Sequence, residues 1–154
     1  GHQPGEGVTA LVGWTAGGPD TWAGGSWLLS GGEFSCLCVW KDNGQCIQCL
    51  EAPAARRCSV TNVAWATDGS MFFAALGRAA NEPALVLAYL FSRSHRAGTP
   101  STLAHCLVAG SGLGGLTLFP HSPTALLACA SSGSFLIWSW DDPGIPTEAQ
   151  DADP

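Results

Sequence analysis

Four cysteines lie close together in the first third of the chain, and their thiolates have the chemistry to hold a metal ion. They are Cys36, Cys38, Cys46 and Cys49. A structural zinc ion needs four thiolate or imidazole ligands drawn together from separate segments. In regular strands Cys36 and Cys38 point to one face, whereas Cys46 and Cys49 point to opposite faces, so only three can converge without a bulge. Because cysteine is also a common small buried hydrophobe, we expect no metal site and keep a small β-rich zinc-binding protein as the alternative.

The histidines are the candidate bases for nucleophilic catalysis. They are His2, His95, His105 and His121. Such catalysis needs a serine or cysteine beside a histidine that a carboxylate orients. His105 and Cys106 are adjacent, so a strand places their side chains on opposite faces. The acids lie mostly in turns and at the C-terminal end, and the chain has no Gly-x-Ser-x-Gly motif. We therefore expect no catalytic residues and no enzyme.

A glycine-rich segment at 110–115 resembles a phosphate-binding loop only in its glycine content. It lacks the lysine and hydroxyl residue that reach phosphate, and the apolar run that follows it indicates a strand. Without a helix N-terminus behind it, the segment is typical of a flexible connection. We expect no bound cofactor.

Two kinds of loop residue are candidates for contact with a partner protein. Trp22 stands in a loop with glycines on both sides, where it is either a binding hot spot or a side chain that folds back to cover a blade edge. Arg56, Arg57, Arg93 and Arg96 form small basic spots on predicted loops, which suits contact with an acidic segment of a partner.

Charged residues make up 12% of the 154 residues, about half of the usual share of ~25%. The net charge is −6, and the segment 141–154 holds five of the 12 acidic residues and no basic one. The rest of the chain is nearly neutral and offers no basic face, so we expect no direct contact with nucleic acid. With so little charge to solvate a surface, we expect the chain to be covered by other protein.

The seven cysteines are odd in number and mostly lie inside apolar runs, unlike the even frameworks of secreted proteins. No signal peptide opens the chain, and the longest apolar run, 84–91, is too short to span a bilayer. We expect an intracellular protein, cytoplasmic or nuclear with the nuclear envelope included, that does not insert into membranes.

These candidate residues must be positioned by strands. The apolar run 37–41 is followed by the polar turn Asp42-Asn43-Gly44 and a second run at 45–50. Asn-Gly accepts the positive φ angles of a short connection, so this stretch predicts a β-hairpin.

Three segments repeat the same order of apolar runs and turns. The predicted strands are 8–14, 27–30, 36–40 and 45–50, then 60–65, 71–76 and 85–91, then 116–119, 125–130 and 135–140. In 36–40 and 135–138 nearly every residue is apolar, as expected of strands covered on both faces. The sequence therefore predicts an all-β protein of three units.

The order of features resembles WD-repeat (WD40) β-propellers with degenerate repeats. Gly1-His2 precedes the first strands, and Trp40-Lys41 replaces the Trp-Asp that closes a repeat. The resemblance implies four-stranded blades at about 1–52, 58–110 and 113–140. It also implies a hydrogen-bonded tetrad formed by His2, Ser30, Glu33 and Trp40. The second and third units lack the Gly-His and the closing Trp-Asp.

What the resemblance implies about function is a non-catalytic protein–protein interaction scaffold within a larger assembly. Propellers close with about 4–8 blades, so three units imply part of a larger propeller. We expect the acidic segment 141–154 to be a disordered tail.

A narrower resemblance joins 60–138 to aladin-like WD proteins of the nuclear pore. It is carried by Ala64-Trp65, Gly69-Ser70, the run 89–93 and the run 116–121. This resemblance implies a nuclear pore-like assembly.

Overall fold

The structure is a computed structural model. It describes residues 7–15, 25–51, 58–77, 83–91, 101–111, 116–122, 125–130, 132–142 and 145–150. Within these ranges the chain forms twelve strands, one short 3-10 turn and no α-helix. No helix in this described part is long and apolar enough to cross a membrane.

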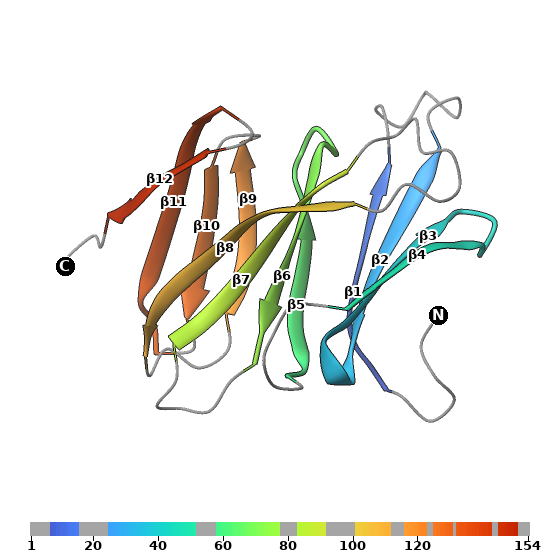
Figure 1. The fold of residues 1–154 in the computed structure, drawn as a ribbon, viewed down its shortest axis with the longest axis horizontal. Helices are drawn as coiled ribbons and strands as arrows, with labels where there is room; N and C mark the ends of the chain where they lie inside the picture. Colours follow the sequence, from blue (N-terminus) through green and yellow to red (C-terminus); the bar gives the residue numbers. More distant parts are fainter. Residues whose placement is uncertain are drawn as a thin grey trace.

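The strands form three antiparallel four-stranded sheets in sequence order, standing side by side (Figure 1). The first sheet contains β1 (Val8–Thr15), β2 (Ser26–Gly32), β3 (Cys36–Lys41) and β4 (Cys46–Glu51), with the turn η1 (Glu33–Ser35) between β2 and β3. The second contains β5 (Val60–Trp65), β6 (Met71–Leu76), β7 (Pro83–Leu90) and β8 (Thr102–Ser111). The third contains β9 (Leu116–Ser122), β10 (Ala125–Ala130), β11 (Phe135–Asp142) and β12 (Ile145–Gln150).

The hairpin predicted around Asn43-Gly44 is confirmed between β3 and β4. Gly44 has φ +79° and donates its N–H to the Lys41 carbonyl at 2.9 Å. The Asn43 side chain accepts the Gln45 N–H at 2.9 Å. Thus the positive φ falls on the glycine, as this turn requires.

The end of the chain differs from the prediction of a disordered tail over 141–154. β11 continues to Asp142, and β12 pairs antiparallel with it, so that Trp140 lies opposite Pro146. The pairing satisfies backbone groups along the free edge of β11, and an edge strand tolerates proline because one side of it needs no partner. Residues 143–144 and 151–154 lie outside the described ranges.

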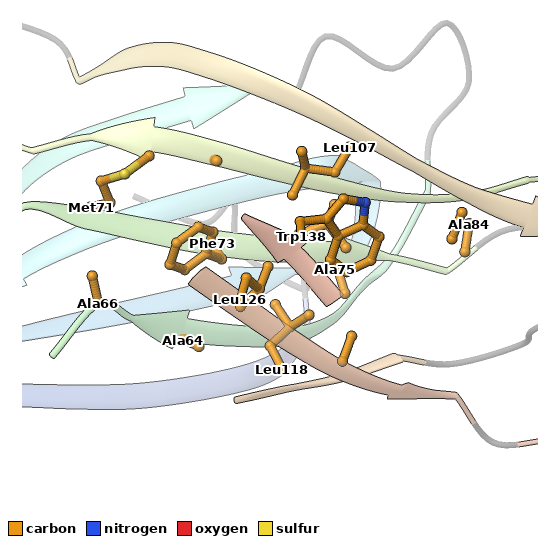
Figure 2. Close-up of a cluster of buried hydrophobic side chains, with 14 of the residues drawn as sticks. Ala64, Ala66, Met71, Phe73, Ala75, Ala84, Leu107, Leu118, Leu126 and Trp138 are labelled. Atoms are coloured by element: carbon orange, nitrogen blue, oxygen red, sulfur yellow. The ribbon is translucent and has the colours of Figure 1, made fainter. Parts of the chain in front are cut away.

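Two apolar cores lie between the sheets. Figure 2 shows the core between the second and third sheets, where Phe73 and Leu107 face Leu118, Leu126 and Trp138. The other core joins the first and second sheets. Its aromatic buried members are Trp27, Trp65, Phe72, Tyr89 and Phe91. The middle sheet is therefore covered on both faces, as nearly continuous apolar strands require.

The first strands of the sheets lie next to one another, β1 against β5 and β5 against β9. The Trp14 Nε1 donates to the Thr67 carbonyl at 3.2 Å, which ties β1 to the turn after β5. The Leu118 N–H donates to the Asn62 Oδ1 at 3.0 Å, which ties β9 to β5. Adjacent first strands and outward meanders are the arrangement of propeller blades around a common axis.

Candidate functional site

Two of the predicted tetrad residues are joined by a hydrogen bond in the first sheet. The Trp40 Nε1 on β3 donates to the Ser30 Oγ on β2 at 2.8 Å, and Ser30 is buried. Glu33 lies in η1 between the two strands, with its N–H donating to the Gly7 carbonyl at 3.2 Å. His2 lies outside the described residues, so the complete tetrad stays a prediction.

Three of the four neighbouring cysteines come together on one face of the first sheet. The Sγ of Cys49 lies 3.4 Å from the Sγ of Cys36 and 3.4 Å from that of Cys38, and the latter two sulfurs are 3.9 Å apart. Cys36 and Cys38 are alternate residues of β3, and Cys38 lies opposite Cys49 on β4. Cys46 is not in this group, and its thiol donates to the Gln48 carbonyl at 3.2 Å.

The three thiols differ in their surroundings. Cys36 and Cys38 are buried, whereas Cys49 is exposed. Burial raises the pKa of the Cys38 thiol, and the neighbouring Cys49 and Cys36 thiols raise it further. A cation at the centre of the group would reverse this effect, because metal ligation deprotonates thiols. Without a cation the buried Cys38 thiol is thus neutral, and the three sulfurs together are donors of the kind that thiophilic cations prefer.

The predicted separation of His105 and Cys106 on β8 is confirmed. His105 is buried and Cys106 is exposed, so the two side chains lie on opposite faces of the strand. Burial lowers the pKa of His105 from its ordinary value of 6.5. His105 is therefore a neutral buried side chain that does not face the adjacent thiol.

The outer face of the third sheet is apolar and exposed. Phe119, Phe135 and Ile137 are 50%, 60% and 49% exposed. Phe119 and Ile137 both lie opposite Leu127, so they share one face, and the core residues Leu118, Leu126 and Trp138 occupy the other. The sequence predicted that the strand at 135–138 is covered on both faces. The described residues cover its inner face and leave its outer face exposed.

The outer face of the first sheet carries the cysteine cluster. Leu11 lies opposite Ser30, which lies opposite Cys38, so these residues share a face. Leu11 is 60% exposed. Leu29 and Leu37 on the opposite face belong to the core shared with the second sheet. Because Ser30, Cys36 and Cys38 are buried, this outer face is less open than that of the third sheet.

A hollow of about 350 Å³ opens at one end of the first sheet. Trp14, Trp27, Trp40 and Lys41 contribute to its lining. Trp40 also donates a hydrogen bond to the buried Ser30, so its indole ring has a fixed position against the sheet.

The predicted contact residues Trp22, Arg56, Arg57, Arg93 and Arg96 lie outside the described residues. Three units too few to close a propeller predicted open ends of the stack, but the sequence did not show which residues form the exposed faces. Near-continuous apolar strands predicted two covered faces, and at the two end sheets the second cover must come from elsewhere.

Comparison with solved structures identifies the fold. The β-propeller domain of Cps50 (Swd1) from Myceliophteria thermophila matches 96% of this chain with a TM-score of 0.60 and 15% identity, over 44% of that chain. A chain in the crystal structure of a mitotic checkpoint complex matches 82% of this chain with a TM-score of 0.54 and 21% identity, over 35% of its length. This chain thus spans less than half the length of either protein.

No protein-family profile and no curated protein sequence matches the chain. The structural match and the three sheets, each a four-stranded meander, agree with the fold that the WD-repeat resemblance implied. The chain has the fold of a set of β-propeller blades.

Proposed function

We propose that this chain is a non-catalytic protein–protein interaction scaffold and that other protein covers its end blades. The observation that carries the proposal is the exposed apolar face of the third sheet, formed by Phe119, Phe135 and Ile137. A contiguous exposed apolar face is typical of a protein–protein contact. The sparse charge of the chain supports the same conclusion.

Further propeller blades are the occupant that fits these faces best. The outer face of the third sheet is apolar, like the sheet faces that are already packed in the two cores. The solved propellers that match are more than twice as long as this chain, which supports additional blades from a longer parent or from a partner subunit.

The proposed setting is a multiprotein complex inside the cell. None of the seven cysteines, which all lie in the described ranges, forms a disulfide, and this suits a reducing compartment. The narrower resemblance of 60–138 to aladin-like proteins makes a nuclear pore-like assembly the finer proposal. We propose no direct nucleic acid contact and no membrane insertion.

The outer-face proposal is tested by size-exclusion chromatography with light scattering on the full chain. We expect a defined oligomer, or recovery only with a co-purifying protein. The double variant with Phe135→Asp and Ile137→Lys should shift the chain to a monomer or release the partner. The control Val108→Asp, at an exposed apolar position of β8, should leave the assembly unchanged.

A monodisperse monomer at high concentration would refute the proposal that the end faces need a cover. Equal effects of the Val108 and Phe135/Ile137 changes would assign association to nonspecific apolar contact. The nuclear pore setting is tested separately by imaging a fluorescently tagged chain in cells, where a diffuse signal without enrichment at the nuclear rim would contradict it.

The three-cysteine cluster lies within one blade of this scaffold. A zinc ion there would stabilise that blade and would not replace the scaffold function, so the zinc-binding protein is not a second candidate function.

A further inference from the structure

The geometry points to a zinc site formed by the three thiolates of Cys36, Cys38 and Cys49. A Zn–S distance of about 2.3 Å with tetrahedral angles places ligand sulfurs about 3.8 Å apart. The three sulfurs here are 3.4, 3.4 and 3.9 Å apart, so small side-chain shifts convert the triangle into one face of that tetrahedron. This inference is independent of the scaffold function.

The sheet fixes the positions of the three ligands before any metal arrives. Cys36 and Cys38 belong to β3, which is hydrogen-bonded to β2 on one side and β4 on the other. The pairing of Cys38 with Cys49 brings the third sulfur across from β4. Ligands on paired strands hold their geometry better than ligands on loops. Binding therefore orders little additional backbone.

Charge favours zinc over a monovalent soft ion at this place. Three thiolates with Zn²⁺ carry a net charge of −1, whereas three with Cu⁺ carry −2. Two of the sulfurs are buried, and burying uncompensated charge is costly. Each thiol loses its proton to solvent when its sulfur binds, so affinity should rise with pH.

The fourth ligand position opens toward solvent at Cys49, the exposed member of the cluster. In the isolated chain a water molecule completes the tetrahedron there, as in zinc sites with three protein ligands. Cys46 is not the fourth ligand in this arrangement, because its sulfur does not belong to the group that the other three form.

The test is zinc analysis of the full chain, purified without chelator, followed by replacement with Co²⁺. We expect one zinc per chain, and cobalt spectra with sulfur charge-transfer bands and the visible bands of tetrahedral coordination. Cys49→Ser should weaken zinc binding by at least about 100-fold, since loss of a ligand exceeds the effect of losing an outer partner. Cys46→Ser is the matched control on the same strand and should bind zinc as the unaltered chain does.

Circular dichroism checks that both variants retain their β-structure, which is expected because the exposed Cys49 changes by one atom. No zinc binding by the folded chain at excess metal would overturn the proposal. Unchanged affinity in Cys49→Ser, or lost affinity in Cys46→Ser, would overturn the three-thiolate assignment. A disulfide between Cys38 and Cys49 in protein purified without added oxidant would overturn it in favour of redox chemistry.

Discussion

Gly69 is the position where a single added methyl group should most clearly test the packing of one blade on the next. It lies in the turn between β5 and β6 with φ +69°, a conformation that favours glycine. A Cβ built there would lie 2.4 Å from the Cζ2 of Trp14, which belongs to the first sheet. The same tryptophan ring bonds the Thr67 carbonyl through its Nε1.

The expected cost of Gly69→Ala has two parts. The left-handed backbone conformation costs an L-residue about 1–2 kcal/mol. Overpacking against the Trp14 ring adds about 1–3 kcal/mol, because the indole must move and strain its hydrogen bond. The free energy of unfolding should therefore fall by about 2–5 kcal/mol.

Gly44→Ala is the matched control, because it separates the two parts. Gly44 has φ +79° in the β3–β4 turn, and a Cβ there meets nothing within 4 Å. It should cost only the backbone part, about 1–2 kcal/mol. Urea unfolding followed by circular dichroism measures both variants at one protein concentration, because association shifts apparent stability. Equal losses in the two variants would refute the packing of Trp14 on the second sheet.

Three further predictions concern single contacts. Trp40→Phe removes the donor to the buried Ser30 hydroxyl, and urea unfolding should show a loss of about 1–3 kcal/mol. Burial lowers the pKa of His105, so below pH 6.5 the unfolded chain binds more protons than the folded chain. The free energy of unfolding should therefore keep the full contribution of His105 above pH 6.5 and fall as the pH drops below it. His105→Leu should flatten this pH profile. Asn62→Ala removes the acceptor of the Leu118 N–H, and hydrogen exchange of that amide should accelerate.

Each of these predictions has a contradicting result. Trp40→Phe is compared with the same change in a Ser30→Ala background; an equal loss in both would deny the role of the Ser30 bond. An unchanged pH profile in His105→Leu would assign the acid sensitivity to other groups. Unchanged exchange at Leu118 would mean that Asn62 does not hold β9.

Local signals predicted the strands well, because their causes lie within a few residues. Asn43-Gly44 needs only its own backbone angles to form a hairpin, and the apolar runs of β6 and β10 mark buried strands. The alternation of Cys36 and Cys38 likewise placed both on one face. The convergence of Cys49 depends on the register of β4 against β3, which no local pattern states.

β12 was missed for the same kind of reason. The segment 141–154 contains prolines and acids, which locally indicate disorder. The strand within it forms because it pairs with the free edge of β11. The residues of the exposed outer faces were also not identified, because apolar strands at an end blade and at a central blade have the same sequence pattern. Only the number of neighbouring sheets distinguishes them.

The position of β6 between the two cores has a consequence for the order in which the chain folds. Met71, Phe73 and Ala75 face the third sheet, and Phe72, Ala74 and Leu76 face the first. Both cores thus contain side chains of this one strand of the middle sheet. During synthesis the first sheet therefore leaves the ribosome with its apolar inner face bare, and it can be buried only after the middle sheet has emerged. A chaperone that shields nascent chains would find its binding surface in that interval.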